Sequence, residues 1–384
     1  MRLTKKLRGE VREVVIPRDL QSFLRDIVDG RNGFELGDPW RISDRALSVV
    51  VPIIRRNAPE RLYVTMYEVA KELDIRDTGR IDRVEFQNRA GKPVFVRAGT
   101  IFEGSTQNRA SEHSCVIQPG REEVVVRCVH QTHGISPGAE MRYGDIAPWL
   151  VTRTLLSERG QREVWHSVNL YIECLKNINV NFSDEEPQPR ELKGEGGRGR
   201  PGRGGRPPSG VPDDTIFCGN AIRDRRVAEI FNQVMERTLF PPESSTDLLG
   251  AMRALGRARA TLDDMMQRVP LFPEQVGAII FDPLGVHAIE CFDSPKSWEA
   301  IKKEVIERFG DLVSMEQAEH LFELRPDKIV PFLRKFIAGL EKFEERTVRR
   351  DDMSETRAVK GEGVVGEYTL VKNRVIHCIL TRAG

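Results

Sequence analysis

Thiol, imidazole, amide and guanidinium side chains gather in residues 94–133, VFVRAGTIFEGSTQNRASEHSCVIQPGREEVVVRCVHQTH. HSCVI (113–117) and VVVRCVH (124–130) are rich in β-branched residues, and QPGR (118–121) between them is a turn sequence, so we predict a β-hairpin. Direct pairing across a loop of even length places alternating residues on one face. They are Ser111, His113, Cys115, Ile117, Val124, Val126, Cys128 and His130. Because the opposite face is charged, this face is predicted to turn inward.

The polar groups on this face need partners, because a buried polar group without one costs about 1–3 kcal/mol. The simplest interpretation is structural: the two thiols are small core residues, and the imidazoles bind backbone groups. A second interpretation is a metal site, structural or catalytic, because alternating residues on adjacent strands converge. Its ligands would be His113, Cys115, Cys128 and His130, joined by His133. Their spacing is not that of a zinc finger or ribbon.

A third interpretation is a ligand-binding or catalytic pocket. Arg109 falls on the inward face, and its guanidinium offers a fixed fork of donors to a phosphate or carboxylate. Three neighbours can hydrogen-bond the polar edge of a ligand, namely Glu103, Gln107 and Asn108. Cys128 and His130 are the catalytic candidates, because a thiol beside imidazole and guanidinium groups can form the nucleophilic thiolate. We therefore predict that a small anionic ligand binds at this end of the sheet, and leave open whether the protein is an enzyme.

The composition is that of a globular chain. With 384 residues, 39% of them hydrophobic, it is long enough for one large core or two ordinary ones. A formal net charge of +1 argues against a protein that binds nucleic acid over its whole surface. The six cysteines show no CxxC spacing, which fits free thiols in a reducing cytosol. We expect a cytoplasmic protein without a membrane segment, because the apolar run SVVVPII (48–54) is far shorter than the roughly 18 residues of a membrane helix. The oligomeric state stays open.

Hydrophobic periodicity predicts an α+β fold in which antiparallel β-hairpins form a sheet or sandwich with helices packed on it. The stretches with helical spacing include 18–29, 150–178 and 297–309, the last beginning with a Ser cap. Two further hairpins are predicted, one joining 83–88 to 93–99 and one at 276–292 around Pro283-Leu284-Gly285. In the latter, His287 and Cys291 are four apart and are expected on one strand face. The chain end looks like three strands.

Residues 184–213 differ from the rest in composition. Gly, Pro and Arg dominate and apolar residues nearly vanish, so we predict a disordered insertion that cannot offset its ordering entropy. Its GGRGRPGRGGRPP tract resembles arginine-glycine segments that bind RNA by charge and stacking. A flexible solvated spacer is the simpler interpretation. RNA binding through residues 190–208 remains an alternative function.

The order of several motifs resembles the ARG and rhodanese-phosphatase-superfamily-associated protein family. They are MYEVAKE, RIDRVEFQNRAGKPVFVRAGTIFEG, TQNR, CVH, REVWHSV, QVGAIIFDPLGVHAIECFDSPKSWEAI and RVIHCIL. The resemblance covers most of the chain on both sides of the insertion. It implies one interrupted domain, with a β-rich part at 1–183, the insertion at 184–213 and an α/β part at 214–384.

Functional residues carry over from the family only in part. The Gln107-Asn108-Arg109 triplet and Cys128 match the family pattern. In the family, the element around this cysteine reads cysteine, valine, glutamate, and an arginine and a tryptophan follow shortly after. This chain has His130 where the family has the glutamate, and it lacks the arginine and the tryptophan. The family name suggests a neighbourhood of nucleotide or ADP-ribose chemistry, which makes such a molecule the expected anionic ligand. The cofactor, if the protein uses one, is left open.

Overall fold

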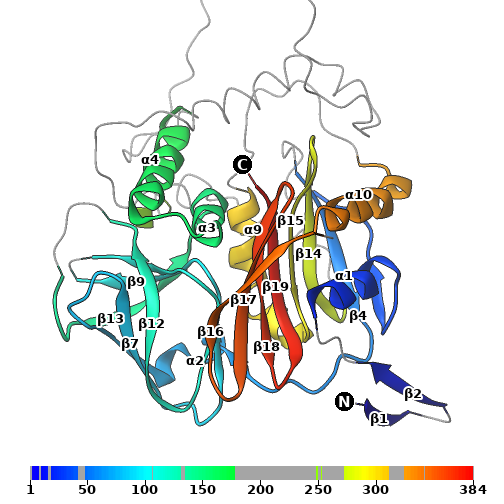
Figure 1. The fold of residues 1–384 in the computed structure, drawn as a ribbon, viewed down its shortest axis with the longest axis horizontal. Coiled ribbons are helices and arrows are strands. Elements are labelled where there is room, and N and C mark those ends of the chain that lie inside the picture. The colour runs from blue at the N-terminus through cyan, green and yellow to red at the C-terminus, as the bar shows by residue number, and fades with distance from the viewer. Residues whose placement is uncertain are drawn as a thin grey trace, which may run out of the picture.

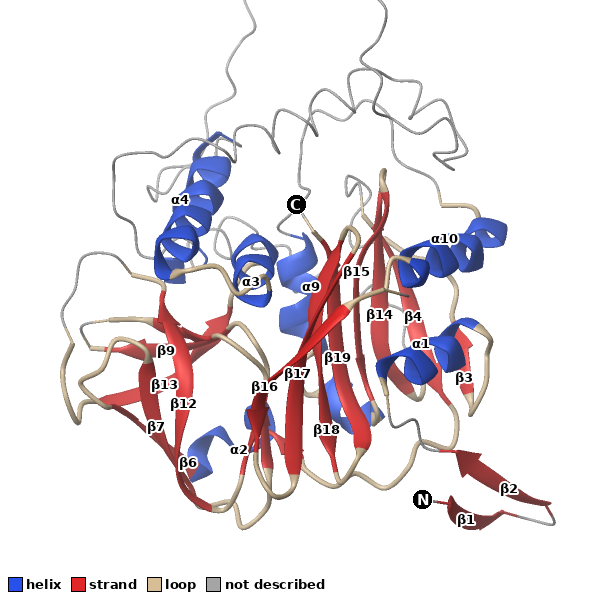
Figure 2. Ribbon diagram, viewed as in Figure 1, coloured by secondary structure: helices blue, strands red, loops and turns tan. Residues whose placement is uncertain are grey.

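The computed structural model describes residues 2–7, 10–15, 19–41, 48–105, 107–130, 135–177, 248–249, 252, 272–310, 324–340 and 342–383. An eight-stranded sheet, a closed six-stranded barrel and a three-stranded sheet make up most of the described structure (Figure 2). Helices pack on them, so the predicted α+β class with antiparallel strands is confirmed. The predicted insertion at 184–213 lies outside the described residues.

The eight-stranded sheet joins segments from both ends of the sequence. Its order is β16 (Glu344–Arg350), β17 (Ser354–Gly361), β18 (Val364–Val371), β19 (Arg374–Arg382), β15 (Gly285–Phe292), β14 (Gln275–Asp282), β4 (Val49–Arg55) and β3 (Phe34–Leu36). All neighbours are antiparallel. The predicted hairpin at 276–292 is confirmed as β14 and β15, and the three predicted strands at the chain end are β17, β18 and β19.

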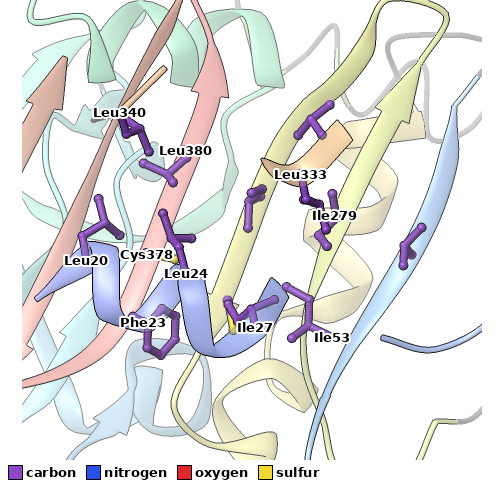
Figure 3. Close-up of a cluster of buried hydrophobic side chains, with 14 of the residues drawn as sticks. Leu20, Phe23, Leu24, Ile27, Ile53, Ile279, Leu333, Leu340, Cys378 and Leu380 are labelled. Atoms are coloured by element: carbon purple, nitrogen blue, oxygen red, sulfur yellow. The ribbon is translucent and has the colours of Figure 1, made fainter. Parts of the chain in front are cut away.

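Both faces of this sheet are buried, because its strands are apolar on both sides. In β14, Ile279 and Phe281 belong to one hydrophobic cluster, whereas Ala278 and Ile280 belong to another. Two helices, α1 (Leu20–Val28) and α10 (Pro326–Ala338), cover the first face (Figures 1 and 3). Asp19 caps α1 through its side chain, which accepts a hydrogen bond from the Ser22 amide at 2.8 Å.

The second face packs against α8 (Pro295–Glu299) and α9 (Lys302–Gly310). We predicted one helix over 297–309 that starts at a Ser cap. Instead, two helices form, and the residue in the N-cap position is Ser294, followed by Pro295 at the first helical position. Trp298 is 1% exposed within this second cluster, where burial of one large apolar side chain contributes about 1.5–3 kcal/mol.

The closed barrel runs in the order β10 (Arg109–Ser111), β12 (Gly120–Cys128), β7 (Arg83–Asn88), β6 (Leu73–Asp77), β13 (Glu140–Ile146) and β9 (Thr100–Gly104). Phe86 and Phe102 meet edge to face in its core, 5.3 Å apart. Two helices that replace the predicted long one, α3 (Trp149–Leu156) and α4 (Gln161–Asn177), pack on another side of it. Smaller elements complete the described fold: β1 (Arg2–Leu7), β2 (Glu10–Val15), β5 (Val64–Thr65), α2 (Met66–Val69), the 3-10 turn η1 (Ala70–Glu72), β8 (Val94–Val96) and β11 (Cys115–Ile117).

The predicted hairpin over 113–130 is wrong, although both of its strands exist. β11 pairs with β8 in the three-stranded sheet, whereas β12 pairs with β7 and β10 in the barrel. The predicted hairpin that joins 83–88 to 93–99 fails in the same way, because β7 and β8 belong to different sheets. The predicted inward direction is nevertheless correct for four of these side chains. Cys115, Ile117, Val124 and Val126 all lie in the hydrophobic cluster on the barrel side of the molecule.

Buried ion pairs join the barrel side of the molecule to the eight-stranded sheet. Arg97, which follows β8, donates to both oxygens of Glu290 on β15 at 2.6 and 2.7 Å. Burial would raise the pKa of Glu290, but the Arg97 guanidinium outweighs it and holds that pKa at about 2. His377 contacts the same carboxylate at 3.2 Å. Breaking such a pair would leave a buried charge uncompensated. The Arg97–Glu290 ion pair therefore fixes how the barrel side fits against the eight-stranded sheet.

Among the helices of the described residues, none combines the length and the apolar character that a bilayer span requires.

Candidate functional site

The structure brings the predicted guanidinium and the predicted thiol together at one end of the barrel. Arg109 on β10 stands opposite Cys128 on β12 in the strand register. Gln107 connects them: its Nε2 donates to the Cys128 sulfur at 2.6 Å, and its Oε1 accepts from Arg109 Nη2 at 3.2 Å. We call Asp77, Gln107, Asn108, Arg109 and Cys128 the barrel end.

Arg109 is fully buried and is already bound by protein groups. Its Nη2 donates to Asp77 Oδ2 at 2.9 Å, and its Nη1 donates to the carbonyls of Arg83, at 2.7 Å, and Arg80. The guanidinium therefore holds the turn between β6 and β7 in place. Its Nε is different: within the described residues, this buried N–H has no acceptor.

Asp77 is the residue of this site that the sequence did not reveal. Besides binding Arg109, its carboxylate accepts hydrogen bonds from the amides of Gly79, at 2.7 Å, and Ser136, at 3.2 Å. It lies at the end of β6, far before Arg109 in the chain, in an ordinary acidic turn sequence. Nothing in that local pattern indicates a buried ion pair.

Cys128 sits at the end of β12, where α4 begins. Gln161, the first residue of α4, accepts from the Cys128 amide at 3.0 Å and donates to its carbonyl at 2.6 Å. The thiol itself donates to the His130 carbonyl at 2.7 Å, and the His130 amide lies 3.4 Å from the sulfur. Both of these contacts are made by the backbone of His130.

The remaining predicted ligand-binding residues lie around this core. Asn108 is buried, and its Oδ1 accepts from the Gly104 amide at 3.3 Å. Glu103 lies further out on β9, where it forms an ion pair with the exposed Arg142 at 2.9 Å. Asn108 is therefore a buried member of the barrel end, whereas Glu103 pairs with an arginine at the surface.

The predicted metal ligands are dispersed over the fold. His113 contacts Glu367 of the eight-stranded sheet at 2.9 Å through Nδ1. Although burial would lower the pKa of His113, the hydrogen bond and charge of Glu367 raise it. Cys115 lies in the apolar cluster, where burial raises its pKa to about 11. Across the described ranges, no group of three or more His, Cys, Asp or Glu side chains is arranged to hold a metal ion, and His133 lies outside them.

Comparison with known proteins identifies the family. No curated protein and no solved structure matches the chain. Residues 34–381 match the family described as the ARG and Rhodanese-Phosphatase-superfamily-associated Protein domain. This range holds the barrel and nearly all of the eight-stranded sheet. The chain therefore belongs to the ARG and Rhodanese-Phosphatase-superfamily-associated Protein domain family.

Proposed function

We propose that the protein binds a small anionic ligand of the nucleotide or ADP-ribose class at the barrel end. The observation that carries the proposal is the buried Nε–H of Arg109, which has no acceptor within the described residues. Leaving such a donor unsatisfied costs about 1–3 kcal/mol. A ligand oxygen that accepts from Nε recovers this energy, and the ends of barrels are common positions for ligand sites.

The charge around Arg109 also favours an anion. The guanidinium groups of Arg80 and Arg83 share the single carboxylate of Asp82, and the backbone carbonyls of both residues accept from Arg109. The side chains of Arg80, Arg83 and Asp82 carry one positive charge in excess, which favours an anion. Gln107 and Asn108, each about nine-tenths buried or more, would hydrogen-bond the polar edge of that ligand.

Cys128 and His130 are the reactive groups if the bound ligand is also a substrate. Gln107 Nε2 and the His130 amide both point hydrogen-bond donors at the sulfur, which is how a protein stabilises developing negative charge on a nucleophile. The buried thiols of the described residues are all free, as expected in a reducing compartment, and we assign the protein to the cytoplasm.

Calorimetric titration with ADP-ribose, ADP and AMP tests the proposal. Arg109→Ala is expected to abolish binding, but it also removes a structural ion pair and lowers stability. Gln107→Met is the deciding variant, because it keeps the side-chain volume and removes the amide that joins Arg109 to Cys128. We expect it to weaken binding about tenfold or more, the cost of one lost hydrogen bond.

Gln87→Met on β7 is the matched control, because Gln87 is half-buried and alternates in β7 with the buried Phe86. Its affinity should equal that of the unmodified protein. The proposal fails if Gln107→Met, folded by its melting curve, binds as tightly as the control, or if the unmodified protein binds none of the three ligands.

A further inference from the structure

A β-bulge sets His287 apart from its neighbours in β15. Ile280 of β14 pairs with Ala288, but the next residue, Phe281, pairs with Val286. His287 is therefore the extra residue of the bulge. We expected it on the same strand face as Cys291, and that was wrong: Val286 packs in the cluster of Cys291, whereas His287 meets Trp149 on α3, 5.8 Å between rings. Bulges that redirect a side chain are frequent beside binding and active sites.

Asp282 holds the redirected imidazole in one orientation. His287 Nδ1 lies 3.0 Å from Asp282 Oδ2, and the Asp282 carboxylate also binds the guanidinium of Arg382 at the end of β19. Burial would raise the pKa of Asp282, but the hydrogen bond from His287 and the charge of Arg382 lower it to about 2. The carboxylate is thus ionised, so Nδ1 carries the proton that it donates to Asp282.

The other ring nitrogen, Nε2, has no partner among the described residues. His287 is 8% exposed, and its buried Nε2 makes no hydrogen bond to any described residue. Burial lowers the pKa of His287, the Asp282 carboxylate partly offsets this, and the charges of Arg382 and Arg153 lower it further. The imidazole is therefore neutral at pH 7, and Nε2 presents a lone pair that requires a donor.

Arg153 is close enough for its charge to act on the His287 imidazole, and it has no carboxylate partner among the described residues. Arg153 follows Trp149 by one turn of α3, hence on the helix face that meets His287 of β15. Its guanidinium makes no ion pair with any described residue, and its pKa is lowered by burial and by the charges of Arg382 and Arg159. We call Arg153, Asp282, His287 and Arg382 the sheet end. The Arg382 side chain is 25% exposed, so the cluster reaches the surface.

From this geometry we infer a second ligand site, separate from the barrel end, that takes inorganic phosphate. At neutral pH this ion combines negative oxygens with a P–OH proton. The negative oxygens bind the Arg153 guanidinium, and the P–OH donates to the lone pair of His287 Nε2. A carboxylate or a sulfate has no such proton at neutral pH, and would leave Nε2 without a donor.

Titration with inorganic phosphate and with sulfate at neutral pH tests the inference, because both are tetrahedral oxyanions and only phosphate retains a proton. The full chain should bind phosphate about tenfold more tightly than sulfate, the effect of one unmade hydrogen bond. Arg153→Met should weaken both anions. His287→Gln should bring the ratio of the two affinities close to one, because an amide offers a donor as well as an acceptor.

Arg334→Met is the matched control, because Arg334 lies exposed on α10, which covers the opposite face of the sheet. Arg334→Met should retain the phosphate affinity of the unmodified protein and its preference for phosphate over sulfate. Equal affinity for phosphate and sulfate in the unmodified protein overturns the inference, as does phosphate affinity unchanged in a folded Arg153→Met variant. ADP-ribose binding in the same variants reports on the barrel end independently.

Discussion

The barrel end and the sheet end both combine arginine with an aspartate in a buried setting, but their charges are satisfied differently. In the barrel end, Asp77 and two carbonyls take the Nη groups of Arg109, and only Nε is left over. In the sheet end, Asp282 is shared by His287 and Arg382, while Arg153 has no carboxylate among the described residues. Arg109 is therefore mainly structural, whereas Arg153 adds positive charge to the sheet end without forming an ion pair with a described residue.

The difference teaches that a buried arginine is not by itself a binding residue. A buried polar atom without a hydrogen-bond partner is what points to a ligand, because nearly all buried polar atoms in folded proteins have a partner. At the barrel end that atom is a donor and at the sheet end it is an acceptor. The two ends should therefore prefer different ligands, an oxygen acceptor in one case and a proton-bearing anion in the other.

The largest expected effect is on stability at the barrel end. Asp77→Asn removes the carboxylate of the fully buried Arg109, and we expect the free energy of unfolding to fall by about 3–5 kcal/mol, as for other buried pairs that lose one partner. Asp282→Asn should cost less, because Arg382 can turn to water. Urea denaturation of the two variants measures both losses. Equal losses would break the distinction between the two ends.

The next effect is the acid sensitivity of the sheet end. The folded pKa of Asp282, about 2, lies below the unfolded value of about 3.9, so the carboxylate adds stability above pH 4. That contribution, about 2–3 kcal/mol, is lost as the pH falls through the folded pKa. Unfolding followed from pH 5 to pH 2 should show a shallower loss in Asp282→Asn than in the unmodified protein. Parallel curves for the two proteins would mean that folding does not lower the pKa of Asp282.

The smallest effect separates the two arginines. Arg153→Met removes a cation that is repelled by Arg382 and Arg159, so the unfolding free energy should stay the same or rise by up to about 1 kcal/mol. Arg109→Met should instead destabilise the protein. Thermal melts of both variants make the comparison, and a clear loss of stability in Arg153→Met would show that this residue serves the fold.

Elements with local signals could be predicted from the sequence. The β14–β15 hairpin follows from the Pro283-Leu284-Gly285 turn, where Gly285 adopts a φ of +112° that favours glycine. α1 follows from its Asp19 cap and apolar spacing. The turn at 118–121 is equally local, but the partners of its two strands are not. Pairing of β11 with β8 and of β12 with β10 depends on distant residues, which no turn sequence reports.

The candidate sites show the same limit. Arg109 and Cys128 were predicted on one face, but of a hairpin that does not form, and it is the register of β10 with β12 that places them opposite each other. Asp77 was missed because ion pairing across the barrel leaves no local pattern. The direction of His287 was predicted wrongly because a bulge adds one residue and reverses the alternation.

The measurement that tests the central claim most directly is a titration of ADP-ribose into two variants, Gln107→Met and His287→Gln. Each phosphate of ADP-ribose is a diester and carries no P–OH at neutral pH, so this ligand should require the barrel end alone. We predict that Gln107→Met loses affinity and that His287→Gln binds as the unmodified protein does. Loss of binding in His287→Gln, with affinity retained in Gln107→Met, would contradict the assignment of the ligand to the barrel end.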